Sequence, residues 1–233
     1  MNDTYHYGVD EILANTVLFA GLRPDAALTL ETVAQRRHLE RGEVVFRLGD
    51  IGTSMYVITR GKIGMTRPAG TDRDSLLAVL GPGDLLGELT LFDPAPRRAT
   101  ATALTDLDLA EFTASAVRSW LQEEPDVAWH FLQLLARRVR RVNDAMENLL
   151  HGHIPLRVAR MLLDLATKFG TPTLEGIRVN HGLTQEQLAH CVGASRESVN
   201  KSLSELANRG VVRLDLRSLV ILDIAKLTHK AHA

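Results

Sequence analysis

Between about Glu40 and Phe112, apolar residues occur in short β-prone runs that glycine and proline separate. The runs cover residues 44–46, 55–58, 76–80, 100–104 and 107–112. Residues 81–83 (Gly-Pro-Gly) and 93–96 (Asp-Pro-Ala-Pro) lie between runs, where glycine or proline supplies the backbone angles of a turn. Runs at this spacing predict a small all-β sandwich or barrel of the jelly-roll kind.

Helical patterns flank this region. Residues 9–20 and 24–34 carry apolar positions at helical spacing, which predicts two short helices against the open side of the barrel. After Pro125 a longer pattern predicts one helix that continues to Gly152. Its apolar residues are Phe131, Leu135, Val139, Val142, Met146 and Leu149. This stripe could pack on its own barrel, but the arginine pairs 137–138 and 140–141 beside it favour a two-chain coiled coil and hence dimerisation.

A break follows the long helix. Gly152 and Pro155 both oppose helix continuation, so residues 151–155 predict a hinge. We therefore expect a β-barrel domain over residues 1–124, a dimerisation helix and hinge over 125–153, and a further domain over 154–233. His151 and His153 lack a third ligand nearby, so we interpret them as solvated linker residues and expect no metal site.

The third domain carries the pattern of two short helices joined by a tight turn. Thr184 and Gln187 form a capping box that opens a helix over residues 185–191. Gly193 supplies the turn, and Ser195 caps a second helix that reaches about Asn208. Residues 211–214 and 218–222 predict a following β-hairpin. The fold class is therefore α+β, ending in a winged helix-turn-helix of the DNA-binding kind.

Polar side chains at the start of the second helix suit DNA. Arginine can grip guanine with two hydrogen bonds and a carboxylate can accept from cytosine, so we expect Arg196 and Glu197 to read bases in the major groove. Lys201 suits guanine or a phosphate, and Ser198 suits a backbone contact. The alternative is a solvated helix face, against which the spacing and caps weigh. The candidate DNA-binding residues are Thr184, Gln185, Ser195, Arg196, Glu197, Ser198, Asn200, Lys201 and, on the wing, Arg213 and Arg217.

The distribution of charge agrees with this assignment, although the net charge of the 233 residues is only −1. Residues 154–233 hold 11 Lys and Arg against 7 Asp and Glu, a net of +4, so the preceding residues carry −5. A polyanion would therefore bind the C-terminal part. The single cysteine, Cys191, points to a reducing cytoplasm. We expect no membrane span, because no window approaches eighteen uninterrupted apolar residues.

The barrel region contains one stretch with the chemistry of a nucleotide site, residues 87–100. Gly87 exposes backbone N–H groups to a phosphate, the Glu88 carboxylate can accept from a sugar hydroxyl, and Arg97 offers a fork of donors to phosphate oxygens. Sugar together with phosphate indicates a nucleotide. On its own the pattern does not establish a site, because a surface Glu and Arg nine positions apart usually do nothing specific.

Nearly the whole chain, in order, resembles the cyclic-AMP receptor protein (CRP/FNR) superfamily of bacterial regulators, and is most similar to its actinobacterial, GlxR-like branch. The resemblance rests on Gly49-Asp50 with residues 56–58 and 61–62, on residues 87–89 with 96–97, and on residues 183–186 with 192–199. It implies that Glu88 contacts the ribose 2′-hydroxyl and Arg97 the cyclic phosphate, assisted by backbone N–H groups near Gly87 and Arg98. It also implies a homodimer on a palindromic double-stranded DNA site of the TGTGA/TCACA kind.

Two departures from the family pattern concern the ligand. A small or hydroxyl residue usually follows the phosphate-binding arginine, whereas Arg98 stands there in this chain. Val142, followed by Asn143, stands where the family has an adenine-contacting hydroxyl. The candidate nucleotide-binding residues are Gly87, Glu88, Leu89, Arg97, Arg98, Val142 and Asn143. Cyclic AMP is the leading ligand, and weak binding, another cyclic nucleotide or DNA binding without ligand are the alternatives.

The sequence therefore predicts a cytoplasmic, homodimeric transcription regulator that a cyclic nucleotide controls allosterically, with RNA polymerase as a further partner. The main alternative is a constitutive DNA-binding regulator whose barrel binds another ligand or none. A haem-sensing relative would have to use His6, His38 or His130, since the sensor half holds no cysteine. We do not expect an enzyme, because metal-ligand clusters, a nucleophile elbow and a phosphate-loop lysine are missing from the sequence.

Overall fold

The computed structural model describes residues 32–68 and 74–232, which divide into two compact units. One unit extends to Arg140 apart from residues 75–77, and the other consists of residues 75–77 and everything from Arg141 onward. The predicted helix over residues 9–20, and residues 24–31 of the predicted helix over 24–34, lie outside the described part of the chain. Within that part, no helix is both long and apolar enough to cross a bilayer.

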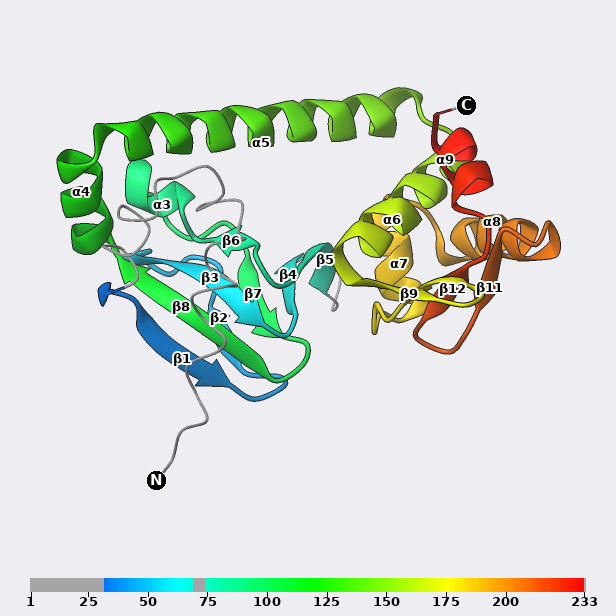
Figure 1. Ribbon diagram of the computed structural model, residues 1–233, viewed down its shortest axis with the longest axis horizontal. Helices are drawn as coiled ribbons and strands as arrows, with labels where there is room; N and C mark the ends of the chain where they lie inside the picture. The colour runs from blue at the N-terminus through cyan, green and yellow to red at the C-terminus, as the bar shows by residue number, and fades with distance from the viewer. Residues whose placement is uncertain (1–31, 69–73, 233) are drawn as a thin grey trace. The chain divides into compact units, whose positions relative to one another are not determined.

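The first unit contains two four-stranded sheets (Figure 1). One has the order β1-β8-β3-β6 and the other the order β2-β7-β4-β5. The strands are β1 (Gln35–Leu39), β2 (Val44–Phe46), β3 (Ser54–Arg60), β4 (Ile63–Pro68), β5 (Asp74–Leu80), β6 (Leu85–Leu86), β7 (Thr100–Ala103) and β8 (Leu107–Thr113). All five predicted runs form strands. In the described residues, however, the sheets remain separate and do not close into a single ring of strands.

The core of this unit follows from the alternation of side chains along β3. Successive residues of a strand point to opposite faces of its sheet. Met55 and Val57 therefore pack in one buried cluster, with Phe112, Trp120 and Phe131. Tyr56 and Ile58 pack in the second cluster, between the two sheets, with residues of β2, β4, β7 and β8. A single strand thus joins the helical layer to the inter-sheet core.

Helices α4 (Ala114–Glu123) and α5 (Pro125–His151) supply that helical layer, and α3 (Leu89–Phe92) is a single short turn. Helix α4 begins at Thr113, whose side chain caps the N–H of Ala116. The predicted long helix is confirmed as α5, but its apolar stripe is divided. Phe131 is buried in the unit's own core, whereas Val139 is exposed on the helix surface. The first part of α5 therefore packs on its own unit.

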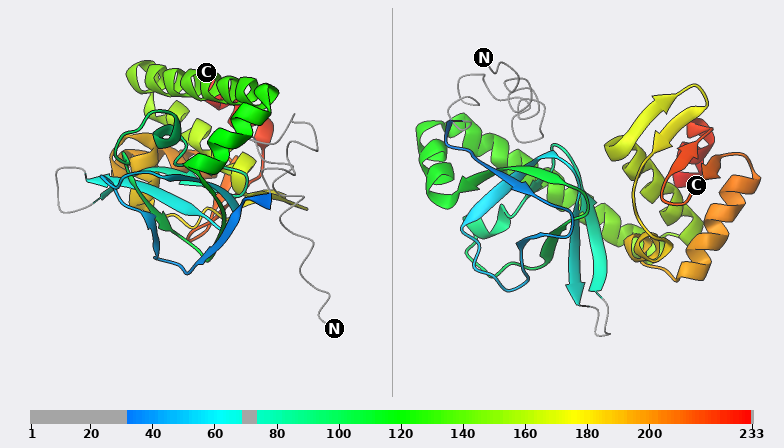
Figure 2. Two further views of the ribbon diagram at one scale, coloured as in Figure 1. Left: turned by 90° about the vertical axis from the view of Figure 1, so that its left-hand side faces the viewer. Right: turned by 90° about the horizontal axis from the view of Figure 1, so that it is seen from below.

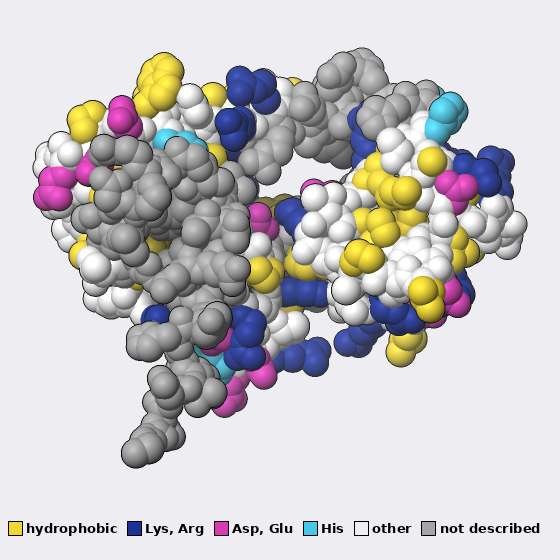
Figure 3. Space-filling view, viewed as in Figure 1, with side chains coloured by type: hydrophobic (Ala, Val, Ile, Leu, Met, Phe, Trp, Pro, Cys, Tyr) yellow, Lys and Arg dark blue, Asp and Glu magenta, His cyan; other side chains and the backbone are white. Residues whose placement is uncertain are grey.

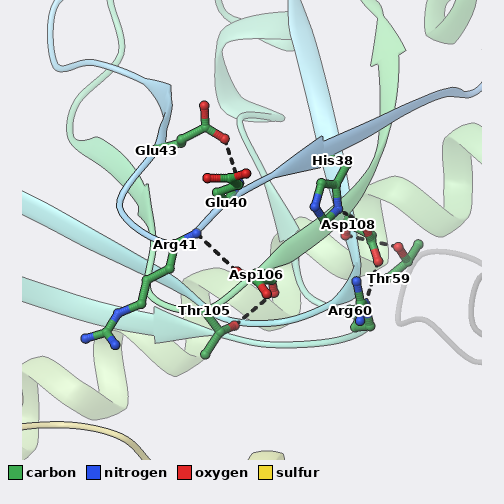
Figure 4. A network of polar contacts seen from close by, with 9 residues as sticks. All are labelled: His38, Glu40, Arg41, Glu43, Thr59, Arg60, Thr105, Asp106 and Asp108. Carbon is green, nitrogen blue, oxygen red and sulfur yellow. Dashed lines mark hydrogen bonds and ion pairs between the residues drawn. The ribbon is translucent and has the colours of Figure 1, made fainter.

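A polar network connects the edge strand β1 to its neighbour β8, and β8 to the next strand, β3 (Figure 4). Asp108 of β8 lies at its centre, with Oδ1 2.6 Å from His38 Nδ1 and Oδ2 accepting from Arg60 Nε at 2.6 Å. Thr59 donates to the Asp108 carbonyl at 3.0 Å. Burial raises the pKa of the Asp108 carboxyl, but the hydrogen bonds from His38 and Arg60 outweigh it and hold the pKa below its ordinary value.

The second unit is a helix-turn-helix with a β-sheet (Figure 2). Its helices are α6 (Ile154–Phe169), α7 (Gln185–Val192), α8 (Arg196–Asn208) and α9 (Ile224–His232). Its strands are β9 (Gly170–Thr173), β10 (Gly176–Val179), β11 (Val212–Leu214) and β12 (Leu219–Ile221), in the order β11-β12-β10-β9. The predicted helix pair and hairpin are both present, and the hairpin forms half of a four-stranded antiparallel sheet.

Candidate ligand site and nucleic-acid interface

The candidate ligand site lies where the turn after β6 meets the loop before β7. Gly87 has a φ of +81°, a conformation that favours glycine. On the opposite side, the Arg97 N–H donates to Asp50 O at 2.8 Å, and the Gly49 N–H donates to Arg97 O at 2.9 Å. Because both the N–H and the carbonyl of Arg97 are hydrogen-bonded, the backbone position from which its side chain extends is fixed.

The Arg97 side chain is held inside the unit, and the residue is only 4% exposed. Its Nη1 donates to Gly87 O at 2.7 Å and to Thr90 Oγ1 at 2.8 Å, and its Nη2 donates to Ser54 O at 2.6 Å. The guanidinium carbon lies 4.4 Å from the centre of the Phe46 ring. Its Nε is buried without a hydrogen-bond partner among the described residues. Burial lowers the pKa of Arg97 from its ordinary value. Electrostatic interactions with Tyr56 and Glu88 raise the pKa but do not offset the effect of burial.

Glu88 is the second charged residue of the site, and it is 2% exposed. Its Oε1 is paired with Nη1 of Arg138, which projects from α5. A buried carboxylate is stable only with such a partner. Sequence reasoning missed this role of Arg138, since it placed the residue among the polar flanks of the long helix. The separation of fifty positions leaves no local pattern from which the pairing could be found.

The structure brings three of the seven predicted ligand residues together, Gly87, Glu88 and Arg97. Leu89 and Arg98 are adjacent to them in sequence, but both side chains are exposed. Val142 and Asn143 are exposed on α5, in the stretch that belongs to the second unit. The buried part of the site therefore consists of one carboxylate and one guanidinium beside a glycine turn.

The helix-turn-helix is built as its local sequence predicts. Thr184 Oγ1 accepts from the Gln187 N–H at 3.2 Å, and Gln187 Oε1 accepts from the Thr184 N–H at 2.8 Å, which completes the capping box. Gly193 ends α7 in the left-handed conformation with a φ of +66°. Ser195 then caps α8, since its Oγ accepts from the Ser198 N–H at 3.2 Å. Two satisfied caps and one left-handed glycine fix the turn between the helices.

Helix α8 presents a polar face and buries an apolar one. Val199, Ser202, Leu203 and Leu206 are buried. Arg196, Glu197 and Lys201 are exposed, while Ser198 and Asn200 are half-buried. At the start of α7, Thr184 is exposed and Gln185 is half-buried. The predicted base-reading residues therefore share the solvent face of α8.

The two predicted wing arginines have different surroundings. Arg217 is exposed in the turn between β11 and β12. Arg213 instead donates from Nη2 to Glu175 Oε2 at 2.7 Å, and this hydrogen bond holds the pKa of Glu175 below its ordinary value. Arg178 of β10 lies 3.7 Å from Asp215 in a second ion pair. Arg213 is thus already paired, and no local sequence pattern indicates Glu175 as its partner.

Known families match both halves of the chain. The model of the cyclic nucleotide-binding domain matches residues 36–124, and the model of the Crp-like helix-turn-helix domain matches residues 156–230. The first match contains both Glu88 and Arg97. The second contains α7, α8 and the following hairpin.

Similar proteins match over nearly the full length. A CRP-like cAMP-activated global transcriptional regulator of Mycobacterium tuberculosis is 42% identical over 96% of this chain and 100% of its own length. The cyclic AMP receptor protein of Thermus thermophilus is 32% identical over 90% of this chain and 94% of its own. A crystal structure of a Thermus thermophilus catabolite activator protein has a TM-score of 0.54 and 32% identity, and covers 93% of this chain and 99% of that one.

Proposed function

Because this chain belongs to the cyclic-AMP receptor protein (CRP/FNR) family of bacterial transcription regulators, we propose that it is a homodimeric, sequence-specific DNA-binding regulator whose operator affinity is controlled by cyclic AMP. The similar proteins are regulators of transcription, in agreement with the prediction that the chain is not an enzyme. The remaining assignments concern the ligand, its contacts, the operator and the partners. They are made here as part of this proposal.

The observation that carries the ligand assignment is that two residues of opposite charge, Glu88 and Arg97, are both buried at the Gly87 turn. In the part of the chain that the structure describes, the buried Nε of Arg97 has no hydrogen-bond partner, so the guanidinium can still offer donors to a phosphate. Glu88 can accept from a ribose hydroxyl, and Gly87 carries a backbone N–H beside both. These residue types fit the phosphate and sugar of a cyclic nucleotide, and the M. tuberculosis relative is described as cAMP-activated. We assign no metal to the site.

The base end of the ligand is assigned to Val142 and Asn143. The amide of Asn143 can both donate to and accept from adenine, whereas Val142 supplies only an apolar contact. A missing hydroxyl costs about 0.5–1.5 kcal/mol, so adenine binding is weakened but retained. The side chain of Arg98 is exposed, in keeping with a charge beside the pocket rather than a residue that fills it. Leu89 lines the same turn through its backbone.

The coupling between ligand and DNA is proposed to run through α5. Glu88 is already paired with Arg138 of this helix, so a nucleotide that binds Glu88 acts directly on α5. Control then means that the nucleotide binds the DNA-competent arrangement of the dimer more tightly than the other arrangement. We assign residues 1–124 to nucleotide binding, 125–153 to dimerisation and the hinge, and 154–233 to DNA binding.

The proposed operator is a palindrome of the TGTGA/TCACA kind, read by the N-terminal end of α8 in each protomer. Two recognition helices must lie roughly 34 Å apart to enter successive major grooves. Arg196 and Glu197 are assigned to bases. Thr184, Gln185, Ser195, Ser198, Asn200 and Lys201, with Arg213 and Arg217, are assigned to phosphates and supporting contacts. A regulator of this kind acts in the cytoplasm, with RNA polymerase as its further partner.

The alternative function is constitutive DNA binding, and one observation favours it. Arg97 and Glu88 both have protein partners, so the site is largely satisfied without any ligand. Gel-shift titration of the operator with and without cyclic AMP separates the two functions. Controlled binding predicts that cyclic AMP lowers the operator Kd at least tenfold, and cyclic GMP serves as the matched nucleotide. An operator Kd that neither nucleotide changes would establish constitutive binding.

Calorimetry with an Arg97→Ala variant tests the ligand site itself. The substitution removes charged hydrogen bonds to the phosphate and is expected to weaken cyclic AMP binding by about 1.5–3 kcal/mol. Lys62→Ala, a cation of the same unit on the turn after β3, is the matched control and should keep wild-type affinity. Equal nucleotide affinity in the wild type and the Arg97→Ala variant would remove Arg97 from the site.

A further inference from the structure

Thr90 is the side chain that accepts a hydrogen bond from Arg97. It is 9% exposed in the short helix α3. Its Oγ1 accepts from Arg97 Nη1 at 2.8 Å and donates to Gly87 O at 3.1 Å. Nη1 itself donates to the same Gly87 carbonyl at 2.7 Å. The three groups form a closed triangle in which the hydroxyl is both donor and acceptor.

A count of donors shows what this triangle does to the guanidinium. Arginine has five N–H donors, two on each Nη and one on Nε. Gly87 O and Thr90 Oγ1 take the two donors of Nη1, and Ser54 O takes one donor of Nη2. Within residues 32–68 and 74–232, the donors left over are the Nε–H and the second N–H of Nη2. These two atoms can form a fork that binds two oxygens of one phosphate.

The backbone at Gly52 leaves space for this arrangement. A Cβ at position 52 would lie 2.0 Å from Thr90 Oγ1 and 2.7 Å from Arg97 Cζ. Gly52 is not among the glycines with positive φ, so its backbone conformation does not require glycine. The requirement is space. A side chain at position 52 would displace either the Thr90 hydroxyl or the guanidinium.

We propose that Thr90 is a positioning residue of the nucleotide site. Its hydroxyl accepts a hydrogen bond from Nη1 of Arg97, and this bond orients the guanidinium so that its Nε–Nη2 edge faces the ligand phosphate. Without the hydroxyl, one Nη1 donor is free and only the carbonyls of Gly87 and Ser54 still hold the guanidinium, so its orientation is less strictly fixed. Gly52 completes the arrangement by giving the hydroxyl its place. The inference rests on the proposed function, because it concerns the residue that is assigned to the phosphate there.

Calorimetry of cyclic AMP binding to the full-length protein tests this role. Thr90→Val keeps the shape of the side chain and removes the hydroxyl, and we expect about tenfold weaker binding, the scale of one hydrogen bond to a charged group. Thr90→Ser restores the hydroxyl and should bind within about twofold of wild type. Thr66→Val makes the same exchange on β4 of the same unit and should leave the affinity unchanged. Melting temperatures without nucleotide establish that each variant is folded, and Thr90→Ala replaces Thr90→Val if the latter does not fold.

A double variant distinguishes action through Arg97 from a general loss of structure. If Thr90 acts only by orienting Arg97, then Thr90→Val has no further effect once Arg97→Ala has removed the guanidinium. The inference is overturned if Thr90→Val binds like wild type, if Thr90→Ser is as weak as Thr90→Val, or if the double variant is weaker than Arg97→Ala alone. Wild-type protein that binds no cyclic AMP would overturn the proposed ligand together with this inference.

Discussion

At residue Gly87, the backbone conformation and the packing of Arg97 both exclude a side chain. The φ of +81° is strained for other residues, and a Cβ would lie 2.5 Å from Arg97 Nη1. We expect Gly87→Ala to lower the free energy of unfolding by about 1–2 kcal/mol from strain alone. It should also weaken cyclic AMP binding, because it displaces Nη1.

Gly42→Ala is the control for this prediction. Gly42 has a φ of +94°, but an added Cβ there would meet nothing within 4 Å. Urea unfolding should show similar destabilisation of the two variants from backbone strain. Calorimetry should then show weaker nucleotide binding in Gly87→Ala only. Equal nucleotide affinities would mean that the position of Nη1 does not matter for the ligand.

The single cysteine allows a prediction about reactivity. Burial raises the pKa of the Cys191 thiol to about 11, and the charge of Asp164 adds to this effect. The unfolded thiol titrates near 8.5, so the folded state gains stability below that pH and loses it as the pH rises from about 8.5 towards 11. At pH 8 a disulfide reagent should label the native protein slowly and the urea-unfolded protein rapidly. Rapid labelling of the native protein would contradict the burial of this thiol.

Single residues also show where sequence reasoning ends. Glu88 and Arg97 could be assigned because they lie in one short stretch with a glycine turn. Arg138 and Glu175 could not, since their partners Glu88 and Arg213 lie 50 and 38 positions away along the chain. Ion pairs across such distances are produced by the packing of elements. The local spacing of residues in the sequence therefore does not predict these ion pairs.

At the scale of elements, helix α7 depends on its capping box. Thr184→Ala removes the hydroxyl that accepts from the Gln187 N–H, and we expect a loss of about 1 kcal/mol in the free energy of unfolding. Gln187→Ala removes the reciprocal bond to the Thr184 N–H and should also destabilise α7. Chemical unfolding of the full-length protein, followed by circular dichroism, measures both effects. Thr184→Ser keeps the hydroxyl and should match the wild type.

The elements that sequence reasoning found have strong local determinants. The capping box, the left-handed Gly193 and the long apolar period fixed α7, α8 and α5. Strand β1 was missed because it is an edge strand whose charged and polar residues are mostly exposed. The hairpin β9–β10 was missed because three of the four residues of β9 are exposed and give no alternation. Strand β1 and the β9–β10 hairpin are both held by hydrogen bonds to a neighbouring strand, and their own sequences do not show a strand pattern.

At the scale of the whole molecule, the net charge is −1, but the second unit is basic. Only some of its basic side chains are free to contact DNA. Figure 3 shows Lys and Arg side chains beside Asp and Glu over this unit. Arg213 and Arg178 are paired with Glu175 and Asp215. Neutral pairs contribute little to a polyanion interface, whereas Arg196, Lys201 and Arg217 remain exposed. We therefore expect Arg196→Ala to weaken operator binding by about 1–3 kcal/mol and Arg213→Ala to weaken it less, as gel shifts at fixed salt would show.

The proposed palindromic operator requires a dimer, because one protomer presents only one recognition helix. Among the described side chains of α5, the large exposed apolar residues are Trp129, Leu132, Val139, Val142 and Met146. They form a stripe with successive spacings of three, seven, three and four positions, and the buried Phe131 is not part of it. A stripe of this period is typical of a coiled-coil seam. Val139 is 58% exposed near the middle of that stripe.

Val139→Glu is expected to convert the dimer into monomers. In a two-fold seam the substitution removes two apolar contacts and introduces two carboxylates without partners, which is far more costly than at a solvent-exposed site. Sedimentation velocity should show the monomer, and operator affinity should fall because each protomer then binds a half-site alone. Leu174→Glu, on the exposed turn after β9, introduces the same charge away from α5 and should remain dimeric. A Val139→Glu protein that sediments as a dimer would place the seam on another face.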